Sequence, residues 1–301
     1  MIRRIFPLFI LGAAAMGAAT GPDEDGFLPE DARILSLAHL PAATKDAALP
    51  WTVRLAPSGK AMVLYGGRLV ALAEQTDAPL SDWNPPSDAE AIRDFCWLDG
   101  STLALLRDTS LDFIRDGKPV RGVTLPGRGM RLARADGGHC YVFGGASGAR
   151  HHEVLLFGVD GKVRNLIRVP EPVTAVAGDG SNTFVAVGPV VYFLTKESAP
   201  RPVFRERTDI TDLAYAAPVG VFYLTEDGVG CMIEPASGLI FLRREVTSLD
   251  CRGERLLLLT RDREILLVNP ISALPHVITE VSKFATEGQK AGAAPLQHRD
   301  G

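Results

Sequence analysis

The chain has 301 residues, of which 46% are hydrophobic and 23% charged, with a mean hydropathy of +0.10 and a formal net charge of −4. These values are typical of a folded globular protein and exclude a chain that is disordered along most of its length. The charge is negative and no run of five or more lysines and arginines occurs. Nucleic acid and anionic membrane surfaces are therefore not expected as main partners.

The N-terminus has the order of a secretory signal peptide, with Arg3 and Arg4 before the apolar run Ile5 to Gly17 and small residues through Ala19. That run is short against the ~20 residues that a helix needs to span a bilayer. We expect cleavage after Ala19, which removes two arginines and takes the net charge from −4 to −6. The mature protein is then expected in the periplasm or outside the cell, without a membrane span.

Three further segments set the predicted domain limits. Residues 20–32 are acidic and rich in Pro and Gly, which indicates a linker. One folded domain is predicted over residues 33–284. Residues 285–301 turn to Ala, Gly, Gln and charged residues, so a disordered tail is expected there.

Within the domain, one pattern recurs every 36 to 43 residues. Each copy opens with alternating apolar residues, reaches a Gly or Asp seven or eight positions later and then enters a strongly apolar second strand. The first strands start at Trp51, Ile92, Met130, Val173, Ile210 and Val246. The predicted second strands are Ala61 to Tyr65, Thr102 to Leu106, Cys140 to Phe143, Thr183 to Val187, Val221 to Thr225 and Leu256 to Thr260.

The second strands lack polar alternation, most clearly at Leu256 to Leu259, so both of their faces should be buried. Third strands follow in every copy, and the fourth strands are weaker and more polar, as suits an outer edge. The first copy has no good fourth strand, because Glu74 to Glu90 contains three prolines and several aspartates. Arg33 to Leu40 and His276 to Val281 remain as spare strands, which could lie side by side where the ends of the chain meet.

This period and strand order resemble the broad group of bacterial β-propellers related to WD40, NHL and YVTN repeats. The Gly-His and Trp-Asp signatures of true WD40 repeats are missing, so the resemblance names no family. It implies an all-β fold, a β-propeller of four-stranded antiparallel blades. Six blades are expected, and seven are possible if the two ends form a split closing blade; a β-sandwich is the alternative fold.

Four cysteines in an exported chain favour disulfides over metal or redox-active thiols. Cys96 and Cys140 belong to adjacent repeats near the same rim, and Cys231 and Cys251 also belong to adjacent repeats. We predict a disulfide within each pair. The alternative is four buried free thiols.

The histidines give little sign of a metal site, since HExxH and paired Cys spacings are absent. His151-His152-Glu153 is the one cluster, and it follows a Gly-rich stretch that predicts an exposed hairpin. P-loop and nucleophile-elbow motifs are also absent.

Propeller ligands usually bind at the ring axis, where the first strands expose polar side chains. The candidates there lie within the first six positions of their repeats: Arg93, Asp94, Arg131, Asp212 and Asp250. The three carboxylates could hold a divalent cation, by analogy of fold with calcium-dependent six-bladed lactonases. The structural alternative is that these aspartates bond backbone groups at strand ends.

The sequence therefore favours an exported, non-enzymatic propeller that binds another protein or a cell-envelope component and needs no cofactor. The enzyme hypothesis is a calcium-dependent lactonase or esterase-like hydrolase with Asp94, Asp212 and Asp250 at the axis. A subunit of a periplasmic dehydrogenase is a third hypothesis, but no Trp-containing docking repeat and no Cys-x-x-Cys-His motif supports it.

Overall fold

The computed structural model describes residues 33–35, 51–72 and 91–269, apart from 66, 129, 136, 145–151, 170, 196–197, 217–219, 234–235, 242–245, 254 and 262–263. Strands, turns and bends make up these residues, without a helix. In this part of the chain, accordingly, no helix is long and apolar enough to cross a membrane. The predicted signal peptide, linker and tail lie outside the described residues.

The described strands form six antiparallel sheets, each built from consecutive hairpins except where β1 joins the last one. The first sheet contains β2 (Thr52–Leu55), β3 (Ala61–Tyr65) and β4 (Arg68–Ala71), and the second contains β5 (Asp94–Trp97), β6 (Thr102–Leu106), β7 (Ser110–Arg115) and β8 (Lys118–Thr124). The third contains β9 (Met130–Ala135), β10 (His139–Gly144), β11 (His152–Gly158) and β12 (Val163–Val169), and the fourth contains β13 (Ala175–Gly178), β14 (Thr183–Val187), β15 (Val190–Thr195) and β16 (Ser198–Arg205). The fifth contains β17 (Asp212–Ala216), β18 (Gly220–Thr225), β19 (Gly228–Ile233) and β20 (Ala236–Phe241), and the last contains β21 (Val246–Arg252), β22 (Arg255–Thr260), β23 (Ile265–Val268) and β1 (Arg33–Leu35).

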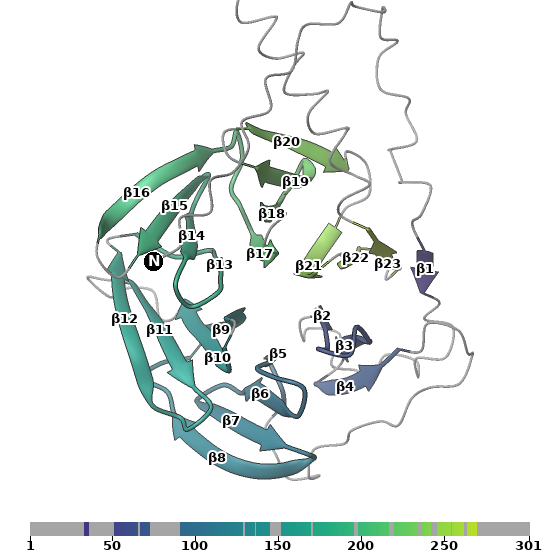
Figure 1. Cartoon of the computed structure of the whole chain (residues 1–301), viewed down its shortest axis with the longest axis vertical. Coiled ribbons are helices and arrows are strands. Elements are labelled where there is room, and N and C mark those ends of the chain that lie inside the picture. The colour runs from purple at the N-terminus through teal and green to yellow at the C-terminus, as the bar shows by residue number, and fades with distance from the viewer. Residues whose placement is uncertain are drawn as a thin grey trace, which may run out of the picture.

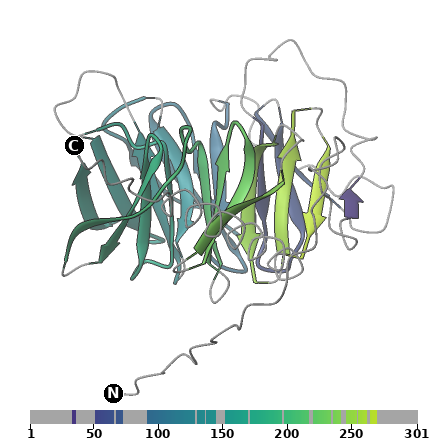
Figure 2. The same cartoon turned by 90° about the horizontal axis from the view of Figure 1, so that it is seen from above.

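These sheets stand around a central axis as the blades of a β-propeller (Figure 1). The first strand of each sheet is innermost: β2, β5, β9, β13, β17 and β21 contact one another in that order, and β21 contacts β2. Seen from the side, the sheets stand next to one another with their strands along the axis (Figure 2). The all-β propeller prediction is confirmed. The number of blades in the whole chain stays a prediction.

The apolar second strands form where they were predicted, because packing between sheets buries both of their faces. Ala61–Tyr65, Thr102–Leu106 and Thr183–Val187 have the predicted limits, β18 and β22 begin one residue earlier than predicted, and β10 is one residue longer at each end. Six apolar clusters fill the spaces between neighbouring sheets, each drawing residues from two sheets. Leu256 and Leu258 face one neighbour, whereas Leu257 and Leu259 face the other.

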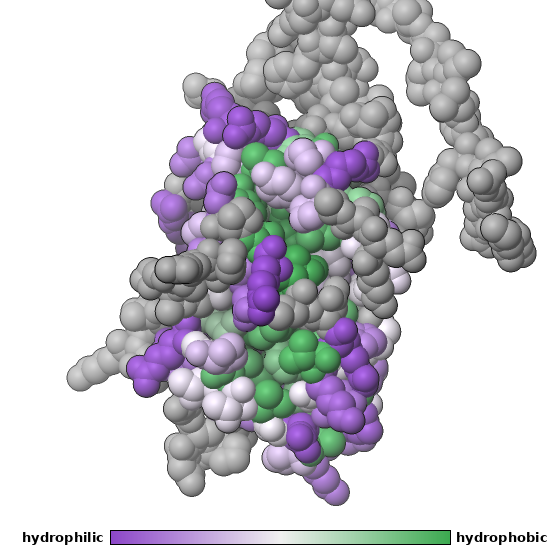
Figure 3. All heavy atoms as spheres, turned by 90° about the vertical axis from the view of Figure 1, so that its left-hand side faces the viewer, coloured by the Kyte–Doolittle hydropathy of each residue, from purple (hydrophilic) through white to green (hydrophobic). Residues whose placement is uncertain are grey.

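The outer strands are more polar, as expected for edges that must resist pairing. Every residue of β8 is exposed except the half-buried Val123. Figure 3 looks onto the side of the ring that carries β12 and β16, where hydrophilic side chains surround a smaller apolar area. Val120 and Val163 are the exposed large hydrophobic residues of the described chain.

The two ends of the domain meet in the last sheet. Arg33, Ile34 and Leu35 pair antiparallel with Leu267, Leu266 and Ile265 of β23, so β1 supplies the outer strand of a sheet begun by the other end of the chain. Arg33 to Leu40 was expected beside His276 to Val281; its described part, Arg33–Leu35, pairs with β23. The second spare strand, His276 to Val281, lies outside the described residues. In the first sheet three strands are described, and Glu74 to Glu90 also lies outside the described part.

The four cysteines are buried free thiols in the structure. Each predicted pair shares one cluster between neighbouring sheets: Cys96 of β5 with Cys140 of β10, and Cys231 of β19 with Cys251 of β21. Burial and a hydrogen bond with Cys140 raise the pKa of the Cys96 thiol, and burial raises the pKa of Cys231 to about 12. Protonated, buried thiols are poor nucleophiles. The two disulfides stay predictions.

Candidate functional site

A cavity of about 610 Å³ opens at one end of the ring axis, where the inner strands begin. We call it the mouth. Its wall combines charged, hydroxyl and large apolar side chains from the inner strands β2, β5, β9 and β21, from the residues just before β2, β5 and β17, and from the β6–β7 hairpin: Trp51, Thr52, Arg93, Asp94, Arg107, Asp108, Met130, Arg131, Thr211, Thr247 and Ser248.

Below the mouth the channel is almost closed. The remaining space there is about 20 Å³, bounded in part by Arg54, Arg134 and Tyr215. The Arg134 guanidinium donates to the carbonyl oxygen of Cys251 at 2.9 Å, which fixes it across the channel. We call the layer of charged side chains below the mouth, Arg54, Asp94, Arg134, Asp212 and Asp250, the floor.

Arg54, on β2, is the central residue of the floor, and it was not among the residues predicted from the sequence. Its guanidinium lies 3.3 Å from Oδ1 of Asp94, and both side chains are only 7% exposed. It also donates to the carbonyl oxygens of Val53, Leu132 and Leu249 at 3.0 to 3.4 Å. Arg54 therefore connects four inner strands: β2, β5, β9 and β21.

The charges of the floor compensate one another. Burial works against the positive charge of Arg54, but Asp94, Asp212 and Asp250 outweigh it and raise the pKa of the guanidinium. Burial raises the pKa of Asp94, although Arg54, Arg131 and two backbone N–H groups offset part of this effect. A buried arginine needs such partners, because an unpaired charge in the interior is strongly destabilising.

Each predicted axis aspartate accepts hydrogen bonds from the backbone of two neighbouring inner strands. Each carboxylate binds the N–H of the residue that follows it and one N–H of the next inner strand. The pairs of N–H groups are Phe95 and Leu132 for Asp94, Leu213 and Leu249 for Asp212, and Cys251 and Leu55 for Asp250, at 2.7 to 3.2 Å. The three aspartates thus join three pairs of adjacent sheets at the axis.

These carboxylates do not fit a calcium site. Calcium takes six to eight oxygen ligands that are not already used by other donors, whereas both oxygens of Asp94 accept backbone N–H groups and one also faces Arg54. Over the described ranges, no group of three or more His, Cys, Asp or Glu side chains is placed to hold a metal ion. The geometry corresponds to the structural alternative, in which the aspartates bond the backbone.

The other two predicted residues, Arg93 and Arg131, lie in the mouth. Nε of Arg93 is 2.6 Å from Oδ1 of Asp108, and each of these side chains is 39% exposed. The Arg93 guanidinium lowers the pKa of the Asp108 carboxyl. A second pair, Arg107 with Asp112 at 2.7 Å, lies beside it. Arg107 was not among the predicted residues, because it belongs to the hairpin between β6 and β7 rather than to a first strand.

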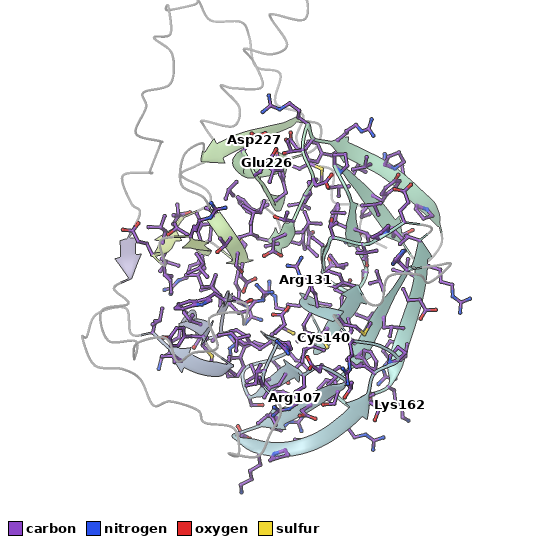
Figure 4. The ribbon with its side chains drawn as sticks, turned by 180° about the vertical axis from the view of Figure 1, so that it is seen from behind. Arg107, Arg131, Cys140, Lys162, Glu226 and Asp227 are labelled. Carbon is purple, nitrogen blue, oxygen red and sulfur yellow. The ribbon has the colours of Figure 1, made fainter. Side chains whose placement is uncertain are left out.

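Arg131, at the start of β9, lies near the centre of the ring (Figure 4). Its Nη1 donates to the carbonyl oxygens of Thr174 and Thr211 at 2.6 and 2.8 Å, and its Nη2 is 3.5 Å from Oδ1 of Asp212. The guanidinium also lies 5.6 Å from the centre of the Phe143 ring. These contacts hold Arg131 across two neighbouring sheets while 41% of its side chain stays exposed.

The histidine cluster of the sequence is remote from the axis. His152 begins β11, and the carboxylate of Glu153 pairs with Arg168 of β12 at 3.2 Å. His151 lies outside the described residues.

Comparison with known proteins establishes the fold. No family model matches the chain, and no curated protein sequence matches it. Two solved structures of virginiamycin B lyase from Staphylococcus aureus are similar. A catalytically inactive variant of that lyase with quinupristin aligns with a TM-score of 0.54 and 10% identity over 79% of this chain and 98% of that one. The selenomethionine-substituted lyase aligns with a TM-score of 0.52 and 10% identity over 72% of this chain and 79% of that one. At this identity the likeness shows a propeller fold alone.

A third structure is less similar. PorZ, a surface component of the type-IX secretion system of Porphyromonas gingivalis, aligns with a TM-score of 0.48 and 12% identity over 72% of this chain and 36% of that one. This likeness is too weak to carry an argument.

Proposed function

We propose that this protein is an exported, non-enzymatic scaffold that binds another protein or a cell-envelope component at the mouth. The observation that carries the proposal is the division between floor and mouth. The floor uses its acidic side chains to join the sheets, whereas the mouth keeps polar side chains exposed around about 610 Å³. A rigid ring that surrounds a cavity lined by both polar and apolar side chains is suited to binding.

The same division opposes hydrolysis. A general base or a metal ligand needs a carboxylate that reaches the substrate or the ion. Asp94, Asp212 and Asp250 are each less than 8% exposed, and their oxygens accept backbone N–H groups.

The proposal of export depends on the N-terminal sequence. Sequencing of the mature N-terminus tests it, and cleavage after Ala19 is expected.

Site-specific photo-crosslinking in the producing cell tests the binding proposal. A photoreactive residue replaces the exposed Thr247 at the mouth, and a matched variant carries it at the exposed Ser58 in the β2–β3 turn, at the other end of the ring. We expect a discrete crosslinked partner from position 247 that is absent from position 58. Equal products from both positions, or none from position 247, contradict the proposal.

A second variant pair tests whether the pocket itself is needed. Thr247→Trp partly fills the mouth, whereas Ser58→Trp adds the same side chain at the opposite end. Capture of the partner should fail for Thr247→Trp and persist for Ser58→Trp.

Thermal unfolding with and without Ca²⁺ tests the hydrolase hypothesis. The scaffold proposal expects the same melting temperature in both conditions. Stabilisation by about 2.7 kcal/mol at 100-fold excess of Ca²⁺ over Kd favours the hydrolase instead.

A further inference from the structure

The wall of the mouth has one cation whose charge is less fully compensated than the others. Arg93 and Arg107 lie within 2.7 Å of Asp108 and Asp112, and Arg54 faces Asp94 in the floor. The carboxylate beside Arg131 is 3.5 Å away, and its two oxygens already accept the N–H groups of Leu213 and Leu249. Among the arginines of the mouth, Arg131 therefore has the most distant carboxylate partner, and 41% of its side chain stays exposed to a ligand.

Arg131 is also held in a fixed position. Its Nη1 donates to two carbonyl oxygens of neighbouring sheets, which orients the planar guanidinium before any ligand arrives. A guanidinium has five N–H donors, and it binds a carboxylate best through two parallel hydrogen bonds. Because the side chain is already ordered, little conformational entropy is lost on binding.

Two threonine hydroxyl groups of the same cavity complement this donor. The Oγ1 atoms of Thr211 and Thr247 line the mouth and donate to the carbonyl oxygens of Leu224 and Leu259, each at 3.3 Å. With their hydrogens used in this way, the hydroxyl oxygens present acceptors to a ligand. The wall thus offers one guanidinium next to hydrogen-bond acceptors.

We infer that the mouth binds a carboxylate with an N–H or O–H donor beside it, and that Arg131 binds the carboxylate. Polypeptide termini and acidic sugars share this chemistry. A polyanion fits poorly, because Asp94 and Asp108 also line the cavity. This inference rests on the proposed binding function, and it adds the ligand class and the residue that selects it.

Titration of the purified protein with small probes tests the inference. N-acetylglycine represents a peptide terminus and glucuronate an acidic sugar, while N-acetylglycinamide is the uncharged control. Binding is measured by NMR shifts of the protein signals. We expect at least one acid to bind, and we expect N-acetylglycinamide to bind at least about tenfold more weakly, because it cannot form the charged hydrogen bond. Which acid binds more tightly distinguishes the two sources.

Three variants locate the interaction. Arg131→Gln should weaken acid binding about tenfold or more, and Arg131→Lys should retain part of it through its charge. Lys162→Gln, which removes an exposed cation from the outer edge of the ring (Figure 4), should leave binding unchanged. An unchanged melting temperature of Arg131→Lys guards against a general loss of folding.

Several outcomes overturn the inference: no acid binds the native protein, the amide binds as tightly as the acids, phosphate binds and the acids do not, or Arg131→Gln binds like the native protein. The proposed function fails separately. If the crosslinked partner is captured equally by native protein and Arg131→Gln, the scaffold proposal stands and the carboxylate inference falls. If position 247 captures nothing, the scaffold proposal itself falls.

Discussion

The floor and the mouth both contain arginine and aspartate, but these side chains differ between the two regions in exposure and in what their hydrogen bonds connect. Arg54 and Asp94 in the floor are 7% exposed, whereas Arg93 and Asp108 in the mouth are 39% exposed. The floor side chains bind backbone groups of neighbouring sheets, but the Arg93 pair bonds side chain to side chain. Burial therefore separates a structural use of these charges from one that leaves them accessible to a ligand.

The largest effect is expected from Arg54→Ala. It leaves Asp94 buried without its cation, so the free energy of unfolding should fall by about 3 to 5 kcal/mol in a denaturant titration. The double variant Arg54→Met with Asp94→Asn removes both charges and should be less destabilised than Arg54→Ala. A loss below about 1 kcal/mol for Arg54→Ala contradicts a structural floor.

Asp250→Ala should come next. It removes the acceptor for two backbone N–H groups, those of Leu55 and Cys251, which join the last sheet to the first. We expect a loss of about 2 to 3 kcal/mol, because each buried unsatisfied donor costs about 1 to 3 kcal/mol. Asp250→Asn retains one acceptor and serves as the control, with a smaller loss. Equal stability of Asp250→Ala and the native protein rules out this role.

In the mouth, Arg93→Gln should change stability little. Its ion pair with Asp108 is half-exposed, and such pairs contribute about 0 to 1 kcal/mol. The same denaturant titration measures this effect, with Arg54→Ala as the reference. A cost as large as that of Arg54→Ala would show that the mouth is structural too and would remove the contrast between the regions.

The smallest effect is a difference in pH dependence between the two regions. Arg93 lowers the pKa of Asp108 below its ordinary value of 3.8, so the stability from this group is present above pH 3.8 and lost as the pH falls through the lowered pKa. Burial raises the pKa of Asp94, so its contribution instead decreases as the pH rises from 3.8 through the raised pKa.

Unfolding midpoints of the native protein, Asp108→Asn and Asp94→Asn between pH 3 and 7 measure this difference. Relative to native protein, Asp108→Asn should lose stability and Asp94→Asn should gain it as the pH rises through these windows. Slopes of the same sign for both variants would show that the two carboxylates share one kind of environment.

Much of the fold could be predicted because its signals are local. An apolar second strand such as Thr102–Leu106 follows from a run without polar alternation, and the turn before it follows from Gly100. The regular spacing of such strands indicated a propeller. The candidate list Arg93, Asp94, Arg131, Asp212 and Asp250 came from their place near the start of each repeat, and the ring brings all five to the mouth or the floor.

The sequence left open whether the aspartates bind the backbone or a metal ion, and it could not show which groups they bind, because these contacts join distant parts of the chain. Arg54 was overlooked although a lone arginine between Val53 and Leu55 in an apolar strand was a signal that buried carboxylates had to lie nearby. Its bond to Leu249 and the bond of Leu55 to Asp250 each join residues 195 positions apart. The strands and the repeat follow from the amino-acid order, since hydrophobic pattern and turn chemistry act over a few residues. Closure of the ring decided which arginines and aspartates meet, and burial on closure decided which of them stay accessible.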